Sequence, residues 1–214
     1  MFAHQVAGPT EFWFTDAADG DVTDPAVLAR LRDDLQLEAI TTMRQVHGAD
    51  VVWAMPGLVA EADALLTYTP DVAVLVRVAD CVPIALATEE RDTIGVVHAG
   101  RKGLVAGVVP AAAQILLDRG RGPVTAWVGP HICGRCYELD SATAAEVAAA
   151  VPSAASTTWT GTPAADIGAG VAAQLEQLGV TVHHLGGCTL EDDRFFSYRR
   201  NATAQRQGAL VVLR

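Results

Sequence analysis

Short apolar runs rich in β-branched residues alternate with polar turns along much of the chain, and this alternation predicts β-strands. The most apolar runs lie at 72–78, 82–87 and 93–97. Weaker strand patterns lie at 11–15, 40–46, 50–53, 62–67, 124–128, 180–185 and 209–213. The number and spacing of these segments indicate a protein built largely on β-sheet.

Other stretches carry apolar residues three and four positions apart, which predicts helices at 25–35, 100–120, 141–151 and 163–178. We expect Asp24 to cap the first helix and Thr162 to cap the last one, whereas a Ser/Thr/Pro loop covers 152–163. Pro110 either kinks the second helix or starts a new one. Strands interleaved with helices, with several hairpins, predict an α/β (α+β) fold. The expected architecture is a single layered domain, residues 1–214, with mixed sheets and with the helices packed on the sheets.

The polar run 88–92 separates two of the most apolar segments and therefore predicts a β-hairpin. If its loop is centred between Glu89 and Glu90, the register places Cys81 opposite His98. Their Cβ atoms would then lie about 5 Å apart. A thiol and an imidazole at that distance indicate a reaction centre, although a buried cysteine and a structurally satisfied histidine give the same pattern.

Charged residues gather around the open end of this hairpin. Asp80 precedes the cysteine, and Arg101 and Lys102 follow Gly100, where a helix is expected to begin. Free backbone N–H groups beside two cations are typical of an anion site, and the same residues also fit a solvated basic turn.

Composition and charge exclude several classes of partner. The formal net charge is −10, which argues against nucleic acid and against an anionic membrane surface. The first residues lack the pattern of a secretory signal, and the longest uncharged apolar stretch, 104–117, is too short to span a bilayer. We therefore expect a cytoplasmic protein with mostly reduced cysteines and no membrane partner. The oligomeric state stays open.

Cys133 and Cys136 form a C-x-x-C pair, with His131 just before it. A single pair is a weak metal signal because no second pair follows at zinc-finger spacing. Whether these cysteines bind a metal stays open on the sequence alone. His47 precedes a glycine that permits a bulge, and taken by itself it is best interpreted as structural.

Several motifs occur in the order found in a known family. They are QVHGADV (45–51), ADALLT (62–67), VADCVPI (78–84), VVHAGRKG (96–103), GPHICGRCYEL (129–139), CT (188–189) and FFSYRR (195–200). The chain resembles the YfiH-type family, whose members have been labelled polyphenol oxidase or laccase-domain proteins and are now described as purine nucleoside phosphorylases. The likeness runs from about residue 11 to the C-terminus.

The resemblance implies one zinc ion held by His47, Cys81 and His98, which would also be the catalytic residues. It implies phosphorolysis of adenosine, inosine and methylthioadenosine, together with an adenosine deaminase activity. Two imidazoles and a thiolate leave the fourth zinc position open, as a catalytic zinc site requires. Phosphate would bind at Arg101 and Lys102. We also assign Gln45 and Arg199 to substrate binding, since both lie in the shared motifs.

The chain departs from the family pattern around this site. The family usually has G-W-R-G after the second histidine, whereas this chain has the basic pair Arg101 and Lys102 between its glycines. The glycine-rich N-terminal loop of the family is replaced by the shorter DAADGDVTD, residues 16–24. The two histidines and the cysteine are all present.

Other functions fit parts of the pattern. A multicopper oxidase needs H-x-H and H-C-H clusters, and the six histidines of this chain include no such cluster, so we reject that mechanism. A single copper ion at the same ligands is compatible with the high affinity of copper for such sites. A metal-free cysteine hydrolase would use Cys81 as nucleophile and His98 as base. An accessory or editing role in cell-wall precursor synthesis, reported for some relatives, is the non-enzymatic alternative.

Overall fold

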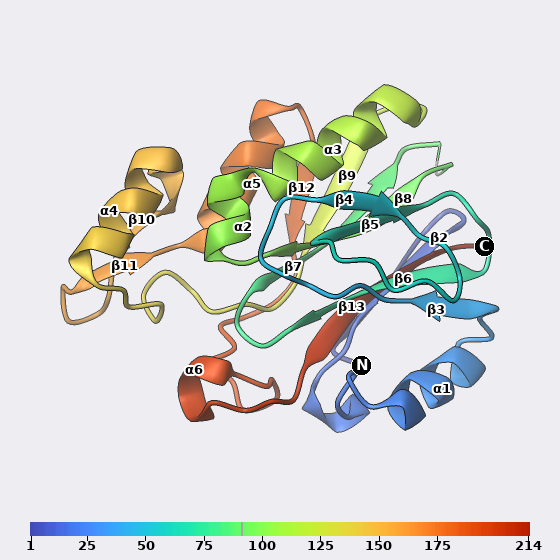
Figure 1. Cartoon of the computed structure of the whole chain (residues 1–214), viewed down its shortest axis with the longest axis horizontal. Coiled ribbons are helices and arrows are strands. Elements are labelled where there is room, and N and C mark those ends of the chain that lie inside the picture. Colours follow the sequence, from blue (N-terminus) through green and yellow to red (C-terminus); the bar gives the residue numbers. More distant parts are fainter. Residues whose placement is uncertain (91) are drawn as a thin grey trace.

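The computed structural model describes residues 1–90 and 92–214 and packs two mixed β-sheets face to face (Figure 1). One sheet has the order β1 (Ala3–Ala7), β2 (Thr10–Phe14), β13 (Gln207–Leu213), β6 (Val72–Val78) and β3 (Ala39–Thr41). The other has the order β12 (Thr181–His184), β9 (Val124–Val128), β7 (Val82–Thr88), β8 (Ile94–Ala99), β5 (Ala64–Thr67) and β4 (Val51–Trp53). Each sheet combines parallel and antiparallel pairs, so the predicted α/β class with mixed sheets is confirmed.

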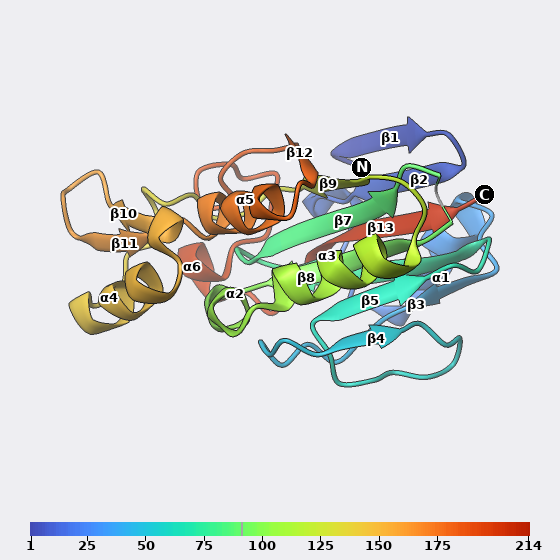
Figure 2. The ribbon, with the colours of Figure 1, turned by 90° about the horizontal axis from the view of Figure 1, so that it is seen from above.

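Helices cover the outer faces of both sheets. The main helices are α1 (Pro25–Asp34), α2 (Arg101–Ala106), α3 (Val108–Arg119), α4 (Ser141–Ala150), α5 (Ile167–Gln177) and α6 (Tyr198–Asn201). α1 lies on the five-stranded sheet, and α2, α3 and α5 lie on the six-stranded sheet (Figures 1 and 2). α4 and the hairpin of β10 (Ala155–Thr157) and β11 (Pro163–Ala165) lie at one end (Figure 2). None of the helices that the structure describes is long and apolar enough to cross a membrane.

The uninterrupted apolar runs are explained by burial on both faces of each sheet. In β6, Val74, Val76 and Val78 pack between the two sheets, whereas Ala73 and Leu75 pack toward α1. β7 follows the same rule, with alternate residues facing either the other sheet or the helices. The core therefore has three layers, and the central layer lies between the sheets.

The helices predicted at 25–35 and 141–151 are confirmed as α1 and α4. Asp24 caps α1, because its carboxylate accepts the N–H of Ala26 at 2.8 Å. The predicted helix at 100–120 is divided at Gly107, which has a left-handed φ of 86°. Pro110 causes no break, because it lies in the first turn of α3, where its missing N–H has no intrahelical partner to lose.

Two sequence predictions are wrong in register or boundary. His98 pairs with Pro83, not with Cys81, because Thr88 and residue 93 close a longer loop than the turn that was assumed. A slip of two residues keeps both side chains on the same face of the sheet, so Cys81 becomes a diagonal neighbour of His98. The last long helix begins at Ile167 instead of 163, since Asp166 is its cap.

Smaller differences concern short elements. The strand predicted at 40–46 ends at Thr41, and the segment 152–163 contains a turn of 3-10 helix and β10 in place of a loop. β1 was not predicted at all. It pairs only with β2 and is largely exposed, so it lacks the apolar pattern that marks the inner strands.

Candidate metal centre and substrate cavity

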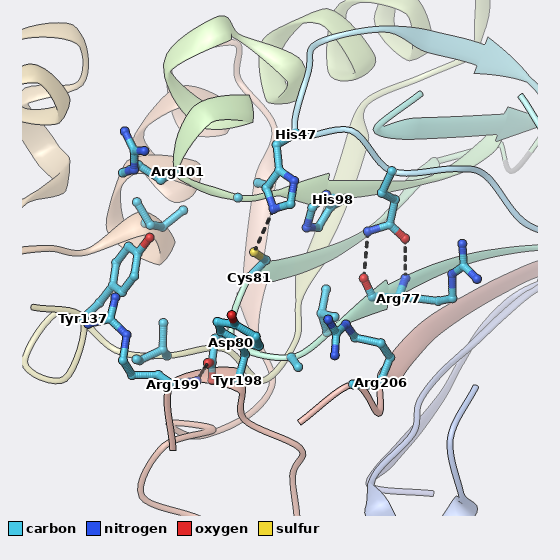
Figure 3. A pocket seen from close by; sticks show the side chains of 18 of the residues that line it. His47, Arg77, Asp80, Cys81, His98, Arg101, Tyr137, Tyr198, Arg199 and Arg206 are labelled. Carbon is cyan, nitrogen blue, oxygen red and sulfur yellow. Dashed lines mark hydrogen bonds between the residues drawn. The ribbon is translucent and has the colours of Figure 1, made fainter. Parts of the chain in front are cut away.

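Three segments that are distant in the sequence bring His47, Cys81 and His98 together. His47 lies in the loop between β3 and β4, Cys81 immediately precedes β7, and His98 lies near the end of β8. One side-chain ligand atom from each residue lies within 4.8 Å of the others. The His47 Nε2 atom is 3.9 Å from the Cys81 sulfur, and the two imidazole rings are 4.8 Å apart between centroids (Figure 3).

A buried carboxylate, which sequence reasoning missed, organises two of these residues. Asp63 is completely buried just before β5, and its Oδ1 lies 2.7 Å from His98 Nδ1. The same carboxylate accepts the backbone N–H groups of Val46, His47 and Gly48 at 3.2, 3.0 and 2.7 Å. It therefore fixes the ring of His98 and the loop that presents His47.

This loop has an unusual backbone at His47, with a left-handed φ of 59°. Such a conformation is uncommon for a residue with a side chain and persists when the surroundings hold it in place. The three hydrogen bonds to Asp63 provide that restraint. Burial opposes ionisation of Asp63, but the hydrogen bonds from His98, Gly48 and Val46 outweigh it and lower the pKa of the carboxyl group.

Gly100 leaves room for the trio. A Cβ at this position would lie 2.6 Å from His47 Cδ2 and 3.2 Å from the Cys81 sulfur. A side chain of any kind would therefore displace the histidine. The glycine is required here by close approach, since its φ of −82° is accessible to every residue.

Cys81 and His98 shift each other's ionisation. Burial opposes the thiolate, but the charge of His98 and hydrogen bonds to His47 and His98 outweigh it and lower the pKa of Cys81 to about 6. Burial also opposes the imidazolium, but the Cys81 charge and the Asp63 hydrogen bond outweigh it and raise the pKa of His98 to about 9. Without a metal ion the pair is therefore a thiolate and an imidazolium at neutral pH.

The trio lies at a cavity of about 660 Å³, a size typical of small-molecule sites. Its lining includes the five arginines Arg44, Arg77, Arg101, Arg199 and Arg206. Arg101 and Arg199 lie on one side of the cavity with Tyr137, and Arg77 and Arg206 lie on the other (Figure 3). A positive cavity in a chain of net charge −10 is suited to an anionic ligand.

The predicted substrate-binding residues have different surroundings. Arg101 lines the cavity and lies 3.8 Å from Glu146 Oε2, whereas Lys102 is exposed and is absent from the described lining. Arg199 lines the cavity with its guanidinium over the ring of Tyr137. Gln45 also lines it, but its amide makes two hydrogen bonds with the backbone of Arg77, at 2.7 and 2.9 Å.

Asp80 connects the hairpin to the C-terminal part of the chain. Its carboxylate accepts the hydroxyl of Thr189 at 2.7 Å and the N–H of Arg199 at 2.6 Å. The residue has a φ of 96°, so the chain turns sharply just before Cys81. These contacts position Arg199 at the cavity. The carboxylate that contacts a histidine of the trio is that of Asp63, not that of Asp80.

Comparison with known proteins identifies the family. A family model described as "Multi-copper polyphenol oxidoreductase laccase" matches residues 19–214. The chain belongs to this family. The laccase-domain and YfiH-type resemblance seen in the motifs is thereby confirmed.

Two curated relatives match over most of the length of this chain. Purine nucleoside phosphorylase ORF3 of Streptomyces griseus is 40% identical, over 97% of this chain and 96% of its own. A purine nucleoside phosphorylase of Streptomyces coelicolor is 43% identical, over 91% of this chain and 83% of its own.

Solved structures share the fold at lower identity. YlmD from Geobacillus stearothermophilus has a TM-score of 0.82 at 24% identity, over 97% of this chain and 93% of its own. The Bacillus licheniformis hypothetical protein YfiH has a TM-score of 0.81 at 18% identity, over 99% of both chains. The two-sheet architecture is thus shared with these solved structures.

Proposed function

We propose that the protein is a zinc-dependent purine nucleoside phosphorylase that acts on adenosine, inosine and methylthioadenosine. The observation that carries the proposal is the convergence of His47, Cys81 and His98 at a cavity lined by arginines. Curated relatives at 36–43% identity are named purine nucleoside phosphorylase, which supports the same activity here.

The donor set fits zinc. His47, Cys81 and His98 would hold the ion, and two imidazoles with one thiolate are borderline-soft ligands that leave one position open for substrate. Because Asp63 accepts the Nδ1–H of His98, the Nε2 atom of that ring is left to face the ion. When bound, zinc supplies Lewis acidity toward the substrate.

Arg101 and Arg199 are the residues that we assign to phosphate. Both line the cavity on the side of Tyr137, and the guanidinium of Arg199 lies over the Tyr137 ring (Figure 3). In phosphorolysis an oxygen of phosphate forms a bond to C1′ of the ribose, and the bond from C1′ to the purine nitrogen breaks. The purine leaves with the electron pair and takes up a proton, and the two arginines hold the attacking anion in line.

A deaminase activity on adenosine belongs to the same proposal. It requires water instead of phosphate as the attacking group, directed at the amino-bearing carbon of the purine. The water oxygen forms a bond to that carbon, the bond from the carbon to the amino nitrogen breaks, and the nitrogen takes one proton of the water and leaves as ammonia while the other proton stays on the purine. The attacked carbon and the leaving group differ from those of phosphorolysis, and the same trio would serve both reactions.

The alternative is a metal-free cysteine hydrolase, and the pKa of Cys81 favours it. A thiol that ionises at about pH 6 beside a protonated His98 has the properties of a reactive nucleophile. In that reading His47 has no catalytic part. His47→Ala therefore separates the two functions, since it removes one ligand of three but leaves the Cys81–His98 pair intact.

Phosphate dependence tests the proposal. Purified protein should release the purine base and form ribose 1-phosphate from inosine only when phosphate is present. Arg101→Ala should raise the KM for phosphate several-fold, whereas Lys102→Ala, which changes the adjacent exposed cation, should leave it unchanged. Base release at the same rate without phosphate would refute phosphorolysis and indicate hydrolysis.

A further inference from the structure

A second cluster of ligand atoms lies outside the His47, Cys81 and His98 trio. It consists of the side chains of Cys133, Cys136, Cys188 and Glu191, whose sulfur and carboxylate atoms all lie within 4.8 Å of one another. The three cysteines are free thiols. The C-x-x-C pair found in the sequence thus gains a third cysteine and a carboxylate from a segment about 50 residues away.

The topology explains why these residues meet. β9 and β12 are parallel neighbours in the six-stranded sheet, so the loops that follow them start at the same end of the sheet. The first loop carries Cys133 and Cys136, and the second carries Cys188 and Glu191. His131, two residues before the pair, is not part of the cluster, because its Nε2 atom faces Gly168.

Backbone contacts hold the two loops in register. His131 and Cys188 form an isolated parallel bridge, and the Thr189 N–H donates to the His131 carbonyl at 3.1 Å. The N–H of Cys133 donates to the sulfur of Cys188 at 3.4 Å. This contact ties the first loop directly to a side chain of the second.

Each loop also turns so that its own two ligands face the same way. The N–H groups of Cys136 and Tyr137 both donate to the Cys133 carbonyl at 3.0 Å, which closes the C-x-x-C turn. The Glu191 N–H donates to the Cys188 carbonyl at 3.2 Å, and the Cys136 thiol contacts Glu191 Oε1 at 3.4 Å. The backbone therefore presents all four groups to a common point.

The C-x-x-C turn is packed against its surroundings. A Cβ on Gly134 would lie 2.6 Å from Asp166 Cβ and 2.8 Å from Ser156 Oγ, and the Gly134 carbonyl accepts the Ser156 hydroxyl at 3.1 Å. A turn fixed by the cap residue of α5 and by β10 has little freedom to rearrange. The cysteines are thus held in place before any ligand arrives.

We propose that Cys133, Cys136, Cys188 and Glu191 bind a structural zinc ion. Four protein ligands close a tetrahedral shell, as in structural zinc sites. Three thiolates exclude Mg²⁺ and Ca²⁺, and the carboxylate oxygen favours zinc over Cu(I). With Zn–S bonds of about 2.3 Å, neighbouring sulfurs lie roughly 3.8 Å apart. Since no two ligand atoms are more than 4.8 Å apart, the sulfurs need to approach one another by at most about 1 Å.

The zinc ion would stabilise the loops that form one wall of the substrate cavity. Tyr137, which lines the cavity, directly follows Cys136, and Thr189, which follows Cys188, donates to Asp80. Arg200 donates to the Thr189 carbonyl at 2.9 Å and thereby extends the connection to α6. The ion joins the two loops on which these residues lie.

Metal counting tests the site separately from the trio. The intact protein should hold about two zinc ions per chain, and His47→Ala/Cys81→Ala about one. In that double variant, X-ray absorption at the zinc edge should show a sulfur shell at about 2.3 Å and oxygen at about 2.0–2.2 Å. The result does not depend on phosphorylase activity, because the variant lacks two of the proposed catalytic residues.

Substitutions in the same double variant identify the ligands. Cys188→Ser should weaken zinc binding by at least about 100-fold, and Glu191→Gln by about tenfold, in competition with a chromophoric chelator. Asp193→Asn is the matched control, since this neighbouring carboxylate is 98% exposed. Circular dichroism would verify that each variant is folded.

Two outcomes would overturn the proposal. One is a folded double variant that binds no zinc when its thiols are reduced. The other is a native chain lighter by two hydrogens, with two cysteines protected from alkylation until reduction, which would identify a disulfide in place of the metal.

Discussion

Asp63→Asn is the substitution that tests most directly how the trio is held. The carboxylate accepts four donors, of which three are backbone N–H groups and the fourth is the Nδ1–H of His98. Asparagine has nearly the same shape but offers one accepting oxygen and one donating NH₂ group. Whichever way the amide is oriented, some of these buried donors lose their acceptor.

The size of the effect follows from the two orientations. If the NH₂ group replaces Oδ2, the N–H groups of Val46 and Gly48 lose their acceptor. If it replaces Oδ1, the His47 N–H loses its acceptor and His98 must move its proton to Nε2, which blocks metal binding there. At about 1–3 kcal/mol for each unsatisfied donor, we expect a loss of about 3 kcal/mol in the free energy of unfolding.

Two measurements follow from this reasoning. A loss of about 3 kcal/mol corresponds to a Tm lower by about 6–12 °C for a chain of this size. Zinc affinity at the trio should fall by about 10–100-fold, as is typical when the partner of a ligating histidine is removed. Differential scanning calorimetry and chelator competition measure the two quantities.

The control is Asp50→Asn, which makes the same chemical change at an exposed carboxylate in the same loop. It should alter neither Tm nor zinc affinity. If Asp63→Asn has the Tm and zinc affinity of the unmodified protein, Asp63 does not position His47 and His98.

Three further predictions concern the trio. Gly100→Ala should abolish zinc binding at His47 while the protein stays folded, as metal analysis would show; Gly187→Ala, where a Cβ has open space, should have no such effect. In metal-free protein, the rate of Cys81 alkylation by iodoacetamide should fall as pH drops through about 6, because the thiolate is lost there, and metal should protect the residue. Zinc affinity should rise about tenfold per pH unit from 7 to 9 and then level off, because below about 9 the ion must displace a proton from His98. A zinc affinity that does not change between pH 7 and 9 would contradict the raised pKa of His98.

The apolar pattern was sufficient to predict the inner strands and the layered α/β class. β6 and β7 are apolar on both faces because both faces are buried, and this is visible in any window of the sequence. Register was harder to predict. It depends on how the loop after Thr88 closes, and the side-chain and backbone bonds that close it are not visible as periodicity.

Only those site residues that stand in recognisable sequence motifs could be predicted. His47, Cys81 and His98 stand in recognisable motifs, whereas Asp63 looks like an ordinary polar residue at the start of a strand. Its partners are 15 to 35 residues away, so its role appears only in three dimensions. The available signal was an acidic residue inside the apolar stretch ADALLT, where a charge must find partners to be buried.

The position of β13 has a consequence for how the protein is made. This strand is the last in the sequence, yet it lies in the middle of the five-stranded sheet, between β2 and β6. Synthesis proceeds from the N-terminus, so residues up to 200 emerge with a gap where the sheet should be continuous. Arg206, which lines the cavity, directly precedes the strand. Until β13 has emerged, β2 and β6 therefore lack their common neighbour, and a product that stops before this strand would expose the inner edges of two strands to aggregation.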